Sequence, residues 1–394
     1  MIVCGETEPI NVLSVYATDE RVTGPGKVLR NTLRGFDQIG QPYYLNAPLE
    51  STRRVWVHCH GRALVDLRKH ESIVLIGPNQ AAFPCDLTKN PPRYKSALLQ
   101  PSQWVVDLWR DEGYTELPVH RWPAGVDIEA WPRREAATPR PEGELLVYHK
   151  YRPTAELQHL CSRLTEYKIP HRVLTCGSYT EPQYREALRK CPFVIWLGRA
   201  ETQGFALLEA LSSDVPILVI EPKGILHAQP LPMVIPRSLK NHKATSAPYF
   251  DERCGVRIQD LGQLDEALQE MRRRLNEFSP SSYVEDNLTL RSQATALVRI
   301  FDSLEDRGSK AKPITIVNRS YRPSIEATLE CAVHRANVKV QAAVAHLALQ
   351  RAKHSSGPRR GKPARNPQQR AEEQGCSSEP NYTRQSPHET NATR

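Results

Sequence analysis

The sequence has no apolar run of about 18 residues or more, the length that a helix needs to cross a bilayer. Its first twenty residues hold no apolar block behind a basic region, so we expect no secretory signal. The nine cysteines occur singly, without the C-x-x-C pairs of zinc sites and redox motifs. Single thiols are typical of a reducing compartment, so the sequence predicts a cytoplasmic protein without a membrane span.

The positive charge is concentrated in the C-terminal tail. The formal net charge of +9 comes from 53 Lys and Arg against 44 Asp and Glu. Residues 310–394 hold 15 of the basic and six of the acidic residues, which leaves 38 of each before them. Because binding to a nucleic-acid backbone needs basic residues clustered on a folded face, we expect no nucleic-acid partner.

Apolar runs alternate with helix-like segments, which predicts an α/β protein with two parallel-sheet lobes. We expect a first Rossmann-like lobe over residues 1–131, a linker over 132–144 and a second Rossmann-like lobe over 145–285. A closing helix over 286–306 and a basic tail over 307–394 follow. Within the tail, residues 324–353 could form an amphipathic helix, and the polar composition beyond them predicts disorder.

Several boundaries follow from local patterns. The sequence predicts buried strands at Ile10–Tyr16, Val55–Val57 and Ile73–Ile76, and one continuous helix over 283–305. The helix that begins in the segment TGPGK is expected to end near Gly35 or Gly40, because glycine commonly follows a helix C-terminus.

The segment 191–219 places Glu201 and Glu209 on either side of Gly204, where an apolar strand turns into an apolar helix. A helix start at the carboxyl edge of a parallel sheet is a prepared anion site, and glycine lets a ligand approach the backbone. The Glu209 carboxylate could accept two hydrogen bonds from a ribose diol. Taken alone, the two residues are more often a dipole partner and a solvated side chain.

The wider pattern resembles the donor-sugar motif of retaining GT-B glycosyltransferases, in which two glutamates eight positions apart flank a glycine and an Ala, a turn, a Pro and a strand follow. This chain has Gln203 where the family prefers an aromatic residue. The segments GPGKVLRNTLRG, QPSQWVVDLW and PVHRWPAGVDIEAWP are also similar to family segments and stand in the same order. The resemblance covers about residues 10–304.

The resemblance implies a GT-B fold with a donor cleft between the lobes and transfer of a sugar, of hexosyltransferase type, from a nucleotide sugar with retention. Basic groups must offset the diphosphate, and Lys150, Arg152 and, with less support, Arg199 stand at strand ends. The implied residues are Glu201, Lys150 and Arg152 for catalysis; Glu209, Gly204, Phe205, Ala206, Gly24 and Gly26 for donor binding; and His58 for the sugar or acceptor. No D-x-D-like triplet stands in a suitable loop, so we expect neither a metal nor a cofactor.

Two other functions fit the same pattern. One is a nucleotide-sugar epimerase of similar architecture, and the other is a non-catalytic relative that serves as a scaffold through its tail helix. His58 and His60 also fit a structural role, and Tyr249 and Asp251 have no assigned role. The sequence leaves the donor base, the sugar and the acceptor (a glycan, a protein or a lipid) open.

Overall fold

The structure is a computed structural model that describes residues 7–18, 23–81, 83–84, 87, 91–92, 94–134, 140–225, 227 and 242–310, with the backbone alone for 307–310. The predicted tail helix at 324–353, the predicted disorder of the tail and the middle of the predicted linker lie outside the described residues.

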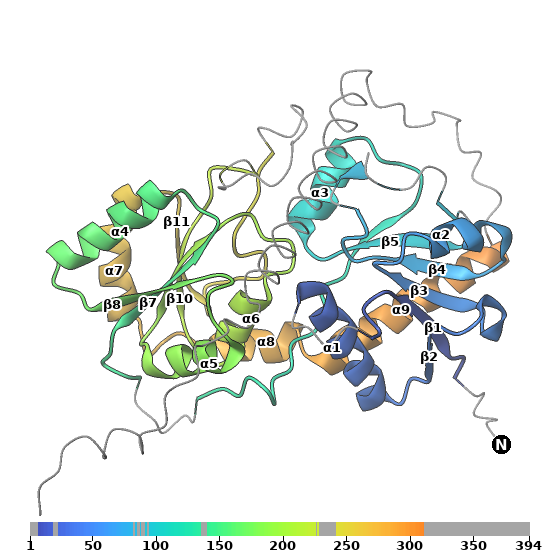
Figure 1. Cartoon of the computed structure of the whole chain (residues 1–394), viewed down its shortest axis with the longest axis horizontal. Coiled ribbons are helices and arrows are strands. Elements are labelled where there is room, and N and C mark those ends of the chain that lie inside the picture. The colour runs from blue at the N-terminus through green and yellow to red at the C-terminus, as the bar shows by residue number, and fades with distance from the viewer. Residues whose placement is uncertain are drawn as a thin grey trace, which may run out of the picture. The chain divides into compact units, whose positions relative to one another are not determined.

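The first lobe is built on a six-stranded parallel sheet in the order β2-β1-β3-β4-β5-β6 (Figure 1). Its strands are β1 (Ile10–Ser14), β2 (Tyr43–Leu45), β3 (Arg54–His58), β4 (Ile73–Ile76), β5 (Ser96–Gln100) and β6 (Val119–Arg121). Its helices are α1 (Gly24–Ile39), α2 (Ala63–Asp66) and α3 (Gln103–Asp111), with short 3-10 turns at Leu49–Ser51 and Leu67–Lys69.

The second lobe is built on a five-stranded parallel sheet in the order β11-β10-β9-β7-β8. Its strands are β7 (Leu145–Lys150), β8 (His171–Thr175), β9 (Val194–Gly198), β10 (Ile217–Ile220) and β11 (Gly255–Ile258). Its helices are α4 (Thr154–Glu166), α5 (Glu181–Lys190), α6 (Phe205–Ser212), α7 (Leu264–Arg273) and α8 (Pro280–Asn287), with a 3-10 turn at Leu261–Gln263.

These two parallel sheets with alternating helices confirm the predicted α/β fold class and fit a two-lobed GT-B architecture. In both sheets the second strand lies outside the first and the third lies on its other side, the doubly wound order. The chain then returns to the first lobe through α9 (Leu290–Lys310), which packs against α1 and β4.

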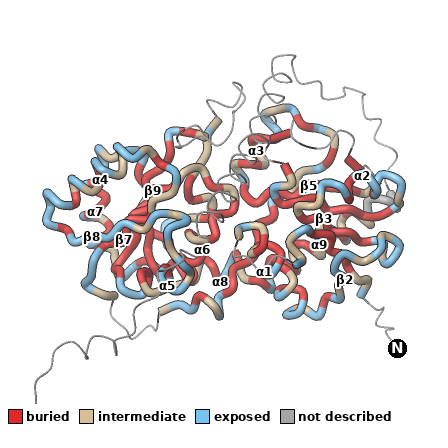
Figure 2. Tube along the Cα trace, in the orientation of Figure 1, coloured by how far each residue is buried: buried red, intermediate tan, exposed pale blue. Residues whose placement is uncertain are grey.

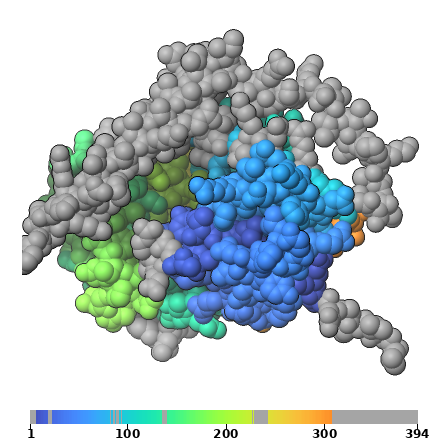
Figure 3. All heavy atoms as spheres, turned by 45° about the vertical axis from the view of Figure 1, so that its right-hand side comes forward, coloured from blue at the N-terminus to red at the C-terminus, as the bar shows by residue number. Residues whose placement is uncertain are grey.

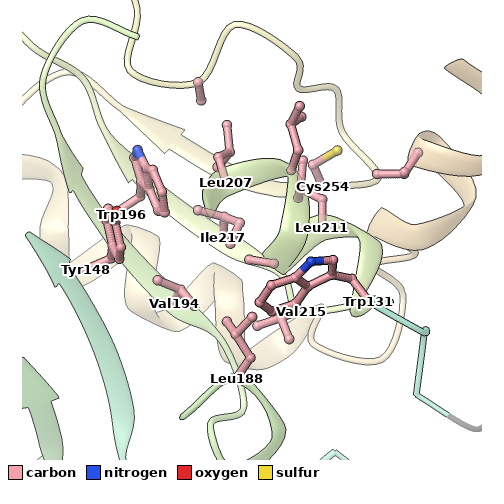
Figure 4. Close-up of a cluster of buried hydrophobic side chains, with 14 of the residues drawn as sticks. Trp131, Tyr148, Leu188, Val194, Trp196, Leu207, Leu211, Val215, Ile217 and Cys254 are labelled. Carbon is pink, nitrogen blue, oxygen red and sulfur yellow. The ribbon is translucent and has the colours of Figure 1, made fainter. Parts of the chain in front are cut away.

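Apolar strands explain why the lobes are stable. All residues of β1, β3, β4, β5, β9 and β10 are buried, as the red cores of Figure 2 show. Such continuous apolar runs are typical of parallel strands covered on both faces. In the second lobe the rings of Tyr148 and Trp196 stack with centroids 4.1 Å apart, beside Leu207 and Ile217 (Figure 4).

Gly35 lies inside α1 rather than at its end, so this predicted alternative was wrong. The helix continues to Ile39 and ends at Gly40, whose φ of 68° is the left-handed conformation of a C-terminal glycine. Gly35 is instead a packing residue, because a Cβ there would lie 2.6 Å from the Leu290 carbonyl oxygen of α9.

The single helix expected over 283–305 was also wrong, since α8 and α9 are separated at Leu288 and Thr289. The Leu288 carbonyl accepts a hydrogen bond of 2.7 Å from the Val126 N–H, and the Thr289 hydroxyl accepts one of 3.1 Å from the Ser292 N–H. A tertiary contact and an N-cap therefore break an otherwise helical pattern.

The first strand is shorter than expected, since β1 ends at Ser14 and a turn begins at Val15. No helix in the described part of the chain combines the length and apolarity that a bilayer crossing requires.

Candidate functional site

A cavity of about 850 Å³ lies where the carboxyl ends of the two sheets meet. From the first lobe it is lined by residues after β1, β3 and β4, and from the second by residues after β7, β8 and β9. Strands β1 and β3, like β7 and β9, flank the point where each sheet's strand order reverses, which is where open α/β sheets bind ligands. The first-lobe surface appears in blue in Figure 3.

Glu201 and Lys150 form an ion pair in this cavity. The Lys150 Nζ lies 2.6 Å from Glu201 Oε1, and the Glu201 residue is only 6% exposed. The Glu201 backbone is fixed from both lobes: its N–H donates to the Thr245 carbonyl at 2.9 Å, and its carbonyl accepts the Trp104 indole N–H at 2.7 Å. The carboxylate is therefore held at a defined place on the cavity wall.

Glu209 lies on the same wall, in the second turn of α6, and is 4% exposed. Its carboxylate pairs with the ammonium of Lys27 from α1, which also pairs with Glu181 at the start of α5. Burial raises the pKa of the Glu209 carboxyl to about 7, against the opposing effect of Lys27. This first-lobe lysine thus spans the cavity between two second-lobe acids.

Helix α6 begins between the two glutamates. Its N-cap, Gly204, has φ 68° and ψ 51°, a left-handed conformation that is strained for most other residues, and no side chain caps the helix. Gly204, Phe205 and Ala206 line the cavity, so the first turn of α6 borders it. The anion site expected at this helix start stays a prediction.

Gln203, at the position where an aromatic residue was expected, connects the two lobes through its side-chain amide. Its side-chain oxygen accepts the Ala124 N–H at 3.0 Å, and its side-chain nitrogen donates to the Ala124 carbonyl at 3.1 Å. The ring of Phe205 packs into the first-lobe core beside Trp122. The departure from the family pattern at position 203 therefore has a structural use.

His58 ends β3 and lines the cavity, although the residue is only 1% exposed. Burial lowers the pKa of its imidazole to about 4, so the ring is neutral at pH 7. Nδ1 lies 2.9 Å from the Ser14 hydroxyl oxygen, which also accepts the Tyr16 N–H at 3.1 Å. His60, in contrast, accepts the Ala63 N–H on Nδ1 and does not line the cavity.

The structure does not bring Arg152 into the cavity. Its guanidinium is 2% exposed, pairs with Glu156, and donates to the carbonyls of Gly198, Ile220 and Glu221. Arg199, at the end of β9, does line the cavity and stacks on the ring of Tyr151 at 4.8 Å.

The two glycines expected to bind the donor differ in position. Gly24 lines the cavity at the start of α1. Gly26 is buried, and its N–H donates to the Thr23 hydroxyl in the N-cap of the same helix. Its role in this structure is to shape the first turn of α1.

Sequence reasoning missed Lys27 and three tyrosines of the cavity wall. Tyr148, Tyr179 and Tyr184 all line the cavity, and the hydroxyls of the first two lie 3.0 Å apart. No local motif marks these tyrosines, which lie on β7, in the connection after β8 and on α5. Lys27 directly follows the glycine-rich turn and could have been found as the cation nearest to it.

Tyr249 and Asp251, left unassigned from the sequence, have structural partners. The buried Tyr249 hydroxyl donates to the Pro101 carbonyl of the first lobe, and Asp251 pairs with Arg253. Both residues stand outside the cavity lining.

Comparison with known proteins found no matching family model and no matching curated protein. Among solved structures, the chain is similar to a sucrose-phosphate synthase from Thermosynechococcus elongatus, with a TM-score of 0.48 and 12% identity over 76% of this chain and 99% of that one. It is also similar to the lipopolysaccharide outer core galactosyltransferase WaaB, with a TM-score of 0.45 and 12% identity over 75% of this chain and 99% of that one. A third, the glycosyltransferase WaaG of lipopolysaccharide biosynthesis, has a TM-score of 0.34 and 13% identity over 75% and 98%.

Proposed function

We propose that the protein transfers a sugar from a nucleotide sugar to an acceptor hydroxyl with retention of anomeric configuration. The observation that carries the proposal is the placement of Glu201 and Glu209 on either side of the α6 N-terminus, in a cavity of about 850 Å³. The cavity size is within the range of about 300–1,000 Å³ that is usual for small-molecule sites. Its carboxylates, cations and helix start match the three chemical parts of a nucleotide sugar.

Each part of the donor has a counterpart in the cavity. The Glu209 carboxylate accepts hydrogen bonds from the ribose hydroxyls. The first turn of α6 binds the diphosphate together with Lys150. The Glu201 carboxylate accepts hydrogen bonds from hydroxyls of the donor sugar. The neutral His58, at the end of β3, donates to the sugar or the acceptor from the opposite lobe.

In the reaction, the bond between the sugar C1 and the diphosphate oxygen breaks, and its electron pair goes to that oxygen. The acceptor hydroxyl oxygen forms the new bond to C1, and its proton passes to the departing diphosphate. Lys150 and the α6 N–H groups stabilise the charge that grows on the leaving group, the type of contribution worth about 10²–10³ in kcat. The cross-lobe contacts of Gln203 and Trp104 hold the two lobes together beside the reacting atoms.

The first test is a thermal-shift screen of nucleotide sugars and nucleoside diphosphates on wild type, Glu209→Gln and Glu186→Gln. Glu186 is a matched control because it is an exposed second-lobe glutamate that pairs with Arg189 and Lys190. A ligand at 100 times its Kd adds about 2.7 kcal/mol of stability. We expect one donor class to stabilise wild type and the control but not Glu209→Gln. Absence of any response in wild type would refute the proposal.

Product analysis separates this function from the alternatives. Incubation of the stabilising donor with candidate glycan, protein and lipid acceptors should yield free nucleoside diphosphate and a glycosylated acceptor, whose anomeric configuration NMR then reads. An epimerised nucleotide sugar without free diphosphate would instead identify an epimerase, and donor binding without any product would favour the scaffold. Metal independence, a further part of the proposal, requires that turnover persist in EDTA.

A further inference from the structure

Most of the charged side chains that line the described part of the cavity form ion pairs with one another. The cations are Lys27, Lys150 and Arg199, and the acids are Glu181, Glu201 and Glu209. Lys27 pairs with Glu181 and Glu209, and Lys150 pairs with Glu201. Arg199 is the remaining cation: its guanidinium has no acidic partner among the described residues, and its Nε is buried there without a hydrogen-bond acceptor.

Arg199 is held by contacts of its backbone and of its side chain. It directly follows β9, and its N–H donates to the Lys150 carbonyl at 3.0 Å, so the two basic residues stand side by side at the ends of adjacent strands. Its guanidinium lies 4.8 Å over the ring of Tyr151. An arginine held on an aromatic ring keeps its N–H donors in a fixed plane, which suits the recognition of phosphate oxygens.

Tyr151 supports this placement at a cost in backbone strain. Its φ of 54° is left-handed, a conformation that is uncommon for a residue with a bulky side chain, and 41% of its surface is exposed. Strained residues of this kind persist where the surrounding structure holds them, often at ligand sites. Here the turn after β7 presents the tyrosine ring beneath Arg199 instead of burying it.

We propose that Arg199 is the second diphosphate-binding cation of the cavity, beside Lys150 and the first turn of α6. This deepens the proposed function, on which it rests, by assigning the group that recognises the nucleoside diphosphate. Lys150 is already paired with Glu201, so it does not offset the full negative charge of a diphosphate. Arg199 follows the adjacent strand and has no acidic partner among the described residues. Arg152, the other candidate at this sheet edge, has its donors occupied by Glu156 and three carbonyls.

The test measures binding of UDP, GDP and ADP, of the corresponding nucleosides, and of inorganic pyrophosphate by calorimetry. The variants are Arg199→Met, Arg199→Lys and the control Arg163→Met. Arg163 is the matched control because its guanidinium also lies over a tyrosine, Tyr167, at 5.2 Å, but on the exposed face of α4 and outside the cavity lining.

In Arg199→Met we expect binding of the preferred nucleoside diphosphate and of pyrophosphate to weaken about 10- to 100-fold, the loss typical of a charge-assisted hydrogen bond. Binding of the nucleoside should be unchanged, Arg199→Lys should recover part of the loss, and Arg163→Met should bind as wild type does. Unchanged diphosphate binding in a folded Arg199→Met would overturn this inference and leave the proposed function intact. Failure of wild type to bind any of the diphosphates would overturn both.

Discussion

The buried carboxyl of Glu209 predicts a pH-dependent stability that a single substitution removes. Burial raises the pKa of this carboxyl from its ordinary value of 4.5 to about 7, although Lys27 acts in the opposite direction. Glu209→Gln keeps the size and shape of the side chain and removes the titrating proton. The ammonium of Lys27 keeps Glu181 as a partner in the variant, so its charge is still offset.

The sign follows from proton binding. Between pH 4.5 and pH 7 the folded protein holds a proton on Glu209 that the unfolded chain releases, so protonation stabilises the fold at low pH. That stabilisation is lost progressively as the pH rises from about 4.5 to 7, and little of it remains above pH 7. For one carboxyl with these pKa values, the change between pH 5 and pH 8 amounts to about 2.5 kcal/mol. Relative to wild type, Glu209→Gln should therefore gain about 2.5 kcal/mol over that range.

The assay is urea denaturation of wild type and variant at half-unit intervals from pH 5 to pH 8, followed by tryptophan fluorescence. Glu186→Gln serves as the control, because its partners Arg189 and Lys190 lower the pKa of the Glu186 carboxyl to about 2. Its pKa lies below pH 5 in both the folded and the unfolded protein, so its difference from wild type should stay nearly constant across the range. A Glu209→Gln difference as flat as that of the control would refute the assignment of a protonated, buried Glu209.

Three further predictions follow from single contacts. Lys27→Met should raise the pKa of Glu209 above about 7, seen as a displacement of the same pH-dependent stability to higher pH, because the cation that lowers this pKa is gone. Gly35→Ala should destabilise the fold by about 1–3 kcal/mol in urea denaturation, since its Cβ would meet the Leu290 carbonyl oxygen. The control Gly61→Ala should change stability by less than about 0.5 kcal/mol, because the nearest atom to its Cβ is 3.6 Å away at the end of the Gln80 side chain. Arg152→Met should cost about 3–5 kcal/mol because it leaves the buried carbonyl oxygens of Gly198 and Ile220 without their donor. Lys150→Met should weaken diphosphate binding in calorimetry with a smaller effect on stability, and equal stability losses would contradict the distinction between them.

The parts of the fold that the sequence predicted are those with strong local patterns. The strand at Ile73–Ile76 was predicted with its observed bounds, because four consecutive buried apolar residues define it. Strand β2 was missed because Tyr43–Leu45 is a short, half-exposed edge strand without such a pattern. The break between α8 and α9 depends on pairing of Leu288 with the distant Val126, which a local pattern does not contain.

The candidate site divides in the same way. The spacing of Glu201 and Glu209 around Gly204 is a local feature of one strand and one helix, and the structure places all three on the cavity wall. The sequence ranked Arg152 above Arg199, although both simply follow strands, and of the two it is Arg199 that lines the cavity. Their difference lies in tertiary contacts, with Glu156 and three carbonyls around one guanidinium and the open cavity beside the other.

Lys27 connects these observations across the two lobes. Its ammonium binds both Glu209 and Glu181, so a ribose whose hydroxyls donate to the Glu209 carboxylate competes with a first-lobe side chain. Glu181 can retain the ammonium during that exchange, because it stands at the start of α5, beside the cavity. Binding of the proposed donor is therefore expected to redistribute these existing ion pairs, while Arg199 has no acidic partner among the described residues at the outset.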